Sequence, residues 1–167
     1  LNSGITTVRD CGCKGCSLLK VRNAINNSFM KGPRIVASGT PITTTGGHCN
    51  FFGTEADTVN DVLKASRLLI KSGVDFIKIM ISGGNMTPGS GSHIDQYGFN
   101  EIKTIVDEAH MHGKKVGAHV HTTRSIEIAI EAGVDVLEHA SWMSPSGVDY
   151  REDLVKSMVE KNVYLCP

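Results

Sequence analysis

Six short runs rich in β-branched and other apolar residues alternate with five helix-length segments along this 167-residue chain. The expected strands are 4–9, 34–38, 75–81, 115–120, 135–138 and 163–166, and the expected helices are 16–30, 57–72, 97–113, 124–132 and 149–161. Such an alternation predicts an α/β fold with a mostly parallel sheet. A complete (β/α)8 barrel needs roughly 250 residues. We therefore expect one domain over 1–167 that holds about six of the eight strands of a TIM-like barrel.

The third expected strand contains a charge where none is usual. Lys78 stands in the middle of Phe76-Ile77-Lys78-Ile79-Met80-Ile81, a run typical of a strand that is buried on both faces. Removing an ammonium group from water is costly unless the group is paired, neutralised or chemically altered. Lys78 could reach solvent from the end of the strand, form an ion pair inside the protein, or serve a functional site.

Histidines close the next two expected strands. His119 ends the run at 115–120, and His139 directly follows the run at 135–138. A single histidine of this kind is more often structural than functional. However, the carboxyl ends of successive parallel strands meet at one mouth of a barrel, where active sites are built. Lys78, His119 and His139 are thus expected to face one another, which favours a metal site.

Five further histidines lie elsewhere in the sequence. His48 lies in the long loop at 42–54, and is either an exposed loop residue or a substrate contact. His121 follows His119 by two residues, so both side chains lie on the same side of an alternating strand. His110 and His112 stand near the end of a helix, where the helix dipole favours them without any catalytic role. His93 lies in the polar segment after the Lys78 strand.

Composition excludes some classes of function. The chain has 17 basic and 17 acidic residues, dispersed and without a basic stripe, so neither nucleic acid nor an anionic membrane surface is an expected partner. No apolar run is long enough to cross a bilayer, which favours a soluble, cytoplasmic protein. Cys11, Cys13 and Cys16 form a CxCxxC cluster that could bind zinc or an iron–sulfur cluster, but it lacks a second ligand pair, and structural thiols are the preferred interpretation.

Six motifs in order carry a family resemblance: GITTVRDCG, GPRIVASG, TTTGGH, VDFIKIMISGG, IVDEAHMHGKKVGAHVH and AGVDVLEHASW. Together they resemble the amidohydrolase superfamily, in particular its imidazolonepropionase-like branch, which includes Xaa-Pro and Xaa-Arg/Lys dipeptidases. The resemblance runs over nearly the whole chain. It implies a partial TIM-like barrel in which the six expected strands are barrel strands 2–7.

The resemblance also implies a site. In the family, a lysine on strand 4 is carboxylated and bridges two divalent metals, which assigns this role to Lys78. His119 and His139 match the metal ligands of strands 5 and 6, and His48 and His121 match substrate contacts. The family's HxH pair of strand 1 and its strand-8 aspartate have no counterpart within 1–167. Two zinc ions are expected in the complete protein, although such ligands also suit manganese or iron.

The implied function is hydrolysis of an amide or peptide bond by a metal-activated hydroxide, on a dipeptide or another small molecule. Lys78 favours a two-metal, dipeptidase-like enzyme over an imidazolonepropionase-type cyclic amide hydrolase, which remains an alternative. A truncated, non-catalytic fragment is a second alternative, and a barrel that binds phosphate at Gly83-Gly84 is a third. Unpaired sheet edges at 5–9 and 163–166 would favour pairing with another copy or segment.

Overall fold

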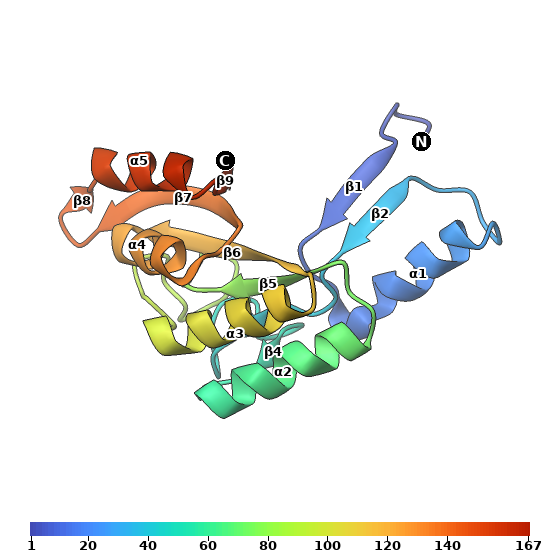
Figure 1. Cartoon of the computed structure of the whole chain (residues 1–167), viewed down its shortest axis with the longest axis horizontal. Helices are drawn as coiled ribbons and strands as arrows, with labels where there is room; N and C mark the ends of the chain where they lie inside the picture. Colours follow the sequence, from blue (N-terminus) through green and yellow to red (C-terminus); the bar gives the residue numbers. More distant parts are fainter.

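The computed structural model describes residues 1–167 and confirms the α/β class (Figure 1). The strands are β1 (Thr7–Asp10), β2 (Arg34–Ala37), β3 (Ile42–Thr43), β4 (Thr54–Glu55), β5 (Phe76–Met80), β6 (Lys115–Thr122), β7 (Val136–Ser144), β8 (Gly147–Val148) and β9 (Tyr164–Cys166). The α-helices are α1 (Ser17–Asn26), α2 (Val59–Lys71), α3 (Phe99–Met111), α4 (Thr123–Ala132) and α5 (Glu152–Glu160), and a 3₁₀ turn, Lys14–Cys16, precedes α1.

The strands form two hydrogen-bonded sheets instead of the single sheet expected from the sequence. β1 pairs with β2, and a second sheet has the order β4-β3-β5-β6-β7, with β8 and β9 both paired to β7. All pairs are parallel except β7–β8. In Figure 1 the β1–β2 pair is set apart from the larger sheet. The sheet does not close on itself, so the fold is that of an open, barrel-like α/β sheet.

A bend after β2 separates the two sheets. β2 pairs with β1, and the chain then turns at Gly39, which has a φ of +71°, before β3 pairs with β5. Asp75 links β2 to the start of β5, because its backbone N–H donates to the Ala37 carbonyl (2.8 Å) and its carboxylate accepts from the Ala37 N–H (2.8 Å). A side chain thus replaces part of the backbone ladder at this position.

Several element boundaries differ from the expectation. The long loop at 42–54 contains the short strands β3 and β4, and β7 continues to Ser144 to form a hairpin with β8. The first helix ends at Asn26 instead of residue 30, because Ser28 takes a left-handed backbone conformation with a φ of +62°. Two-residue strands carry too little periodicity to be recognised from sequence.

Helices cover one side of the larger sheet and bury its core. α2, α3 and α4 lie side by side in sequence order (Figure 1). Each presents an apolar stripe to the strands, as shown by the fully buried Val62, Ile102, Ile105 and Ile126. Thr58 and Asp61 form a capping box that starts α2. This packing holds β5, β6 and β7 in fixed register, which positions the residues at their carboxyl ends.

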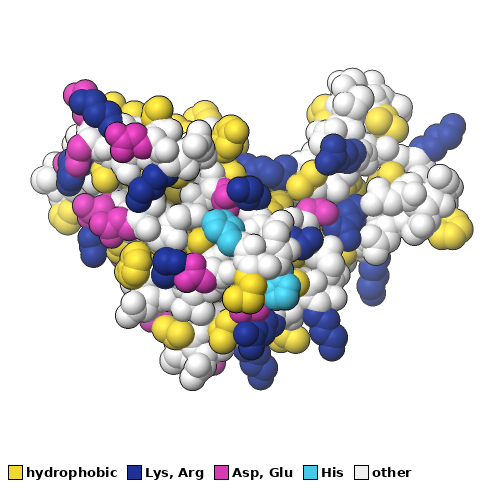
Figure 2. Space-filling view, viewed as in Figure 1, with side chains coloured by type: hydrophobic (Ala, Val, Ile, Leu, Met, Phe, Trp, Pro, Cys, Tyr) yellow, Lys and Arg dark blue, Asp and Glu magenta, His cyan; other side chains and the backbone are white.

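The molecular surface carries both charges without a dominant sign. On the face in Figure 2, lysine and arginine side chains are interspersed with aspartate and glutamate, and a recess separates the lobe that holds β1, β2 and α1 from the remainder. Both strands with an expected free edge have one, since β1 pairs only with β2 and β9 only with β7. No helix has the length and apolar character required to traverse a bilayer.

Candidate active site

Lys78 is buried in the centre of β5. All five residues of β5 are buried, and Lys78 is only 3% exposed, so its ammonium group does not reach solvent as one interpretation of the sequence allowed. Its Nζ lies 4.0 Å from Glu138 Oε1. Burial lowers the pKa of Lys78 to about 8. The neutral amine is therefore more accessible at Lys78 than at an exposed lysine, although the ammonium form still predominates near neutral pH.

The strand register brings His119 and His139 to the same end of the sheet. Met80 of β5 is opposite His119 of β6, and Val120 of β6 is opposite His139 of β7. The two imidazole rings are 5.0 Å apart, centroid to centroid. His139 and Ala140 have φ angles of +73° and +43°, and the β6–β7 register shifts at this point. The irregular backbone turns His139 out of the regular alternation of β7.

These residues line one pocket of about 310 Å³. It contains acidic, basic, imidazole and thiol side chains together with apolar ones: Asp10, Cys11, Gly12, His48, Cys49, Phe52, Lys78, Met80, Met86, His119, Glu138 and His139. The predicted trio of Lys78, His119 and His139 therefore does share one cavity. Their roles as metal ligands remain predictions.

His48 and His121 extend the group to four neighbouring imidazoles. His48 stacks on His119 with centroids 4.4 Å apart, and His121 stacks on His139 at 5.1 Å. His48 is 4% exposed, so the interpretation of it as an exposed loop residue is wrong. His121 is half-buried beside the pocket lining, and its Nδ1 hydrogen-bonds the Ser141 hydroxyl (2.8 Å). The two candidate substrate contacts thus flank the candidate metal ligands.

Burial favours the neutral form of the imidazoles. It lowers the pKa of His119 to about 2, and loss of hydration also lowers the pKa values of His48, of His121 and of the more exposed His139. The Nε2 atom of His119 lies 3.0 Å from the Gly83 carbonyl oxygen. Because a carbonyl can only accept, this nitrogen carries the hydrogen and Nδ1 keeps a free lone pair. A neutral imidazole with one fixed N–H is the form that binds metals.

The donor set fits a divalent metal in part. Imidazole nitrogens suit zinc, and Lys78 would supply oxygen donors only after carboxylation. Asp10 also lines the pocket, and its buried Oδ2 atom has no hydrogen-bond partner, as expected of a carboxylate oxygen whose cation or donor is missing. No three histidine, cysteine, aspartate or glutamate side chains converge at ligand spacing. Within 1–167 the pocket therefore offers some of the ligand types that a metal requires, but no complete ligand set.

Glu138 and Arg9 belong to the site but were not singled out from the sequence. Glu138 is 7% exposed, and its Oε1 atom is 2.7 Å from Nη1 of Arg9. The thiol of Cys11 lies 3.9 Å from the same oxygen. A buried carboxylate directly before a candidate ligand, as in Leu137-Glu138-His139, is the signal that could have identified it. All five cysteines are free, and Cys11 faces this pocket instead of forming a cluster with Cys13 and Cys16.

Gln96 fixes the loop that carries His48. Its side-chain oxygen accepts from the His48 backbone N–H (2.6 Å), and its Nε2 donates to the Met80 carbonyl (2.9 Å) and to the Thr43 hydroxyl (3.1 Å). One amide side chain thus connects the 42–54 loop, β3 and the end of β5. This connection holds the His48 ring against His119.

A glycine provides the space for the His48 ring. A Cβ atom at Gly84 would lie 2.5–2.7 Å from three ring atoms of His48. We expect Gly84→Ala to displace the imidazole and lower the free energy of unfolding by about 1–3 kcal/mol, the usual cost of overpacking. Urea unfolding of the full-length protein would measure this effect. Gly117→Ala is the control, because its new methyl group would lie 3.5 Å from the nearest atom, an ordinary van der Waals distance. Equal urea midpoints for the two variants would contradict tight packing between Gly84 and His48.

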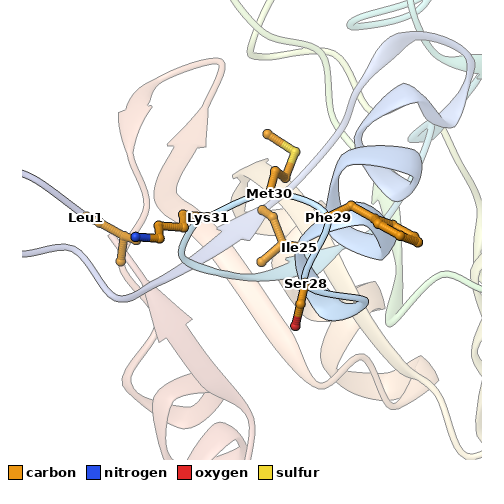
Figure 3. Close-up of a pocket in the computed structure, with 7 residues that line it drawn as sticks. Leu1, Ile25, Ser28, Phe29, Met30 and Lys31 are labelled. Atoms are coloured by element: carbon orange, nitrogen blue, oxygen red, sulfur yellow. The ribbon is translucent and has the colours of Figure 1, made fainter.

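A larger hollow at the end of α1 lacks catalytic groups. It has a volume of about 730 Å³ and is lined by Leu1, Ile25, Ser28, Phe29, Met30, Lys31 and Gly32. Figure 3 shows Leu1 and Lys31 on one side of it and Phe29 directed away. Lys31 is its one ionisable side chain. The smaller, imidazole-rich pocket is therefore the candidate active site.

Comparison with known proteins identifies an ochratoxinase as a relative. The chain is 32% identical to an ochratoxinase of Aspergillus niger over 188 residues, which cover 98% of this chain and 37% of that protein. The crystal structure of the A. niger ochratoxinase superposes with a TM-score of 0.84 at 31% identity, over 99% of this chain and 42% of that one. This chain thus corresponds to a part of that enzyme.

Solved dipeptidase structures are similar to the same degree. A Xaa-Pro dipeptidase with bound methionine has a TM-score of 0.85 at 32% identity, and a prolidase in complex with N-methylphosphonate-L-proline has 0.84 at 33%. Both comparisons cover 98% of this chain and 42% of the other. The chain therefore spans about two fifths of the length of the proteins that it matches. The model of the Amidohydrolase family matches residues 1–167 in full, and the chain belongs to that family.

Proposed function

We propose that this chain forms the central part of a metal-dependent hydrolase that cleaves an amide bond in a dipeptide or a similar small molecule. The observation that carries the proposal is the convergence of Lys78 of β5, His119 of β6 and His139 of β7 on one pocket. Active sites of parallel α/β barrels are built where residues of successive strands converge in this way. The amidohydrolase family and its dipeptidase and ochratoxinase neighbours support hydrolysis of C–N bonds.

In this proposal, Lys78 is carboxylated and holds two divalent metals, and His119 and His139 hold one of them. Carboxylation replaces the ammonium charge of Lys78 with the negative charge of a carbamate. Bound metal cations attract this anion, whereas they would repel the ammonium group. A bound divalent metal, with zinc expected, would polarise the scissile carbonyl and lower the pKa of water. The remaining metal ligands and the general base must come from segments outside 1–167, since this pocket offers no complete ligand set.

His121 and His48 would bind the substrate. The half-buried His121 ring stacks on His139, a residue of the pocket lining, and can donate a hydrogen bond to a substrate carboxylate. His48 stacks on His119 and lines the same pocket. A substrate with a free carboxylate near the scissile amide would match this arrangement, which favours a dipeptide over a neutral amide.

The test uses the full-length protein, freed of metal and then supplied with zinc or manganese. Matched substrates differ only at the C-terminus: Xaa-Pro, Xaa-Arg and Xaa-Lys dipeptides, and the corresponding dipeptide amides. We expect metal-dependent release of the free amino acid, with a higher kcat/KM for the carboxylates. If neither metal yields hydrolysis of any substrate in the panel, the proposal is wrong. Equal rates on acids and amides would reject the assigned carboxylate contact alone.

A further inference from the structure

The carboxylate of Glu138 lies between two cationic side chains. Arg9 Nη1 is 2.7 Å from Glu138 Oε1, whereas Lys78 Nζ is 4.0 Å from the same atom. The first distance is a charge-assisted hydrogen bond, and the second exceeds hydrogen-bond range. Glu138 is therefore bound to Arg9 and only adjacent to Lys78. No other carboxylate lies within 4.0 Å of Lys78 Nζ.

The contact connects parts of the fold that share no backbone ladder. Arg9 belongs to β1 in the two-stranded sheet, while Lys78 and Glu138 belong to β5 and β7 in the larger sheet. The Arg9 guanidinium also lies 5.5 Å above the Phe76 ring, a cation–π contact that restricts its position. Glu138 directly precedes His139, so its placement is coupled to a candidate ligand. Arg9 thus connects the β1–β2 sheet to the candidate site.

Carboxylation of Lys78 changes what its nitrogen requires. The lone pair of the neutral amine forms an N–C bond with dissolved carbon dioxide, one C=O π pair moves to oxygen, and one N–H proton passes to water. The product is an anion whose nitrogen keeps a single hydrogen. Because this site is buried, that hydrogen needs an acceptor. Glu138 Oε1 can accept it after an approach of about 1 Å.

Resting on the proposed function, we propose that Arg9 and Glu138 are a positioning pair for the Lys78 carbamate. Glu138 accepts the remaining N–H of Lys78, and Arg9 offsets the charge of Glu138. Without Arg9, the buried Glu138 carboxylate would lose its hydrogen-bonded cation and would lie next to a carbamate of the same charge sign, which is costly. The two residues are needed for different reasons: Glu138 for its acceptor oxygen and Arg9 for its positive charge.

The test measures the carbamate directly. Full-length protein is supplied with zinc and with ¹³C-labelled bicarbonate below saturation, and the ¹³C carbamate signal is integrated for each variant. Arg9→Met should reduce this signal about ten- to a hundredfold, the usual effect of losing an outer partner of a metal ligand. Glu138→Leu, which removes the acceptor, should reduce it similarly. Glu138→Gln keeps an acceptor oxygen but removes the charge, so this variant should retain the carbamate signal. The double variant Arg9→Met/Glu138→Gln should retain it as well, because no uncompensated carboxylate is left.

A purely structural tie between β1 and β7 gives a different pattern. In that case Glu138→Gln would lose as much signal as Glu138→Leu, and the double variant would be no better than Arg9→Met; either result overturns the inference. Near-UV circular dichroism shows whether each variant is folded. If Arg9→Met is unfolded, the comparison of Glu138→Gln with Glu138→Leu tests the inference without it.

The same experiment separates the two hypotheses. Absence of a carbamate signal in the unmodified protein would reject the proposed function itself, whereas a normal signal in all Arg9 and Glu138 variants would reject only the positioning pair.

Discussion

Replacement of Lys78 by alanine in the full-length protein is expected to remove bound metal and hydrolytic activity together. Lys78 is buried in β5 and lines the pocket with His119 and His139. If its carbamate bridges two metals, its loss deprives the site of a ligand that both metals share. Metals contribute several kcal/mol to hydrolysis of this kind, which corresponds to a loss of about a thousandfold or more in kcat. Metal analysis and a dipeptide assay would measure both effects.

Chemical rescue distinguishes a missing ligand from a damaged fold. Acetate or propionate can enter the space left by the Lys78 side chain and offer two oxygens to the metals, so part of the activity should return. Lys64→Ala, at an exposed lysine on α2, is the matched control and should change neither quantity. An alanine variant of Lys78 that keeps its metal and most of its rate would show that the lysine is only a buried partner of Glu138.

The second large effect concerns His119. We expect His119→Ala to lower metal content at least about tenfold, because a neutral imidazole with a free Nδ1 lone pair is lost from the pocket. Ring stacking would be lost at the same time, since His119 contacts the rings of His48, His121 and His139. The metal content of the purified full-length variant, normalised to folded protein, is the measurement.

Two helical histidines provide the control for His119. His110 pairs with Asp135 (2.8 Å) and His112 with Glu108 (3.3 Å), and both lie at the partly exposed end of α3. The double variant His110→Ala/His112→Ala should keep its metal content, at a stability cost of about 1 kcal/mol or less per lost surface pair. If the double variant lost as much metal as His119→Ala, the assignment of ligands by strand position would be wrong.

Local patterns were sufficient for most of the regular structure. Runs of β-branched residues and helical stripes with caps indicated six of the strands and all five α-helices, with errors of a few residues at their ends. These patterns work because each element buries one defined face, and burial repeats with the period of the element. β3, β4 and β8 were missed, since strands of two residues have no period to detect.

Local patterns also indicated which residues meet. The parallel order of β5, β6 and β7 brings Lys78, His119 and His139 to one pocket, and that order follows from the alternation of strands and helices. The buried lysine was visible as a charge inside an apolar run. Sequence alone therefore determined the fold class and three of the side chains that share the candidate pocket.

Only the tertiary structure decided what surrounds those side chains. The bend at Gly39 divides the sheet, Gln96 holds His48 against His119, and Arg9 pairs with Glu138. The contacts of Gln96 and Arg9 have no local signature, because each joins segments that are far apart in the chain. Cys11 and Glu138, which lie close together in the same pocket, are separated by 127 residues. Periodicity reports whether a side chain faces the interior, but the partner that it finds there depends on how distant strands are brought together.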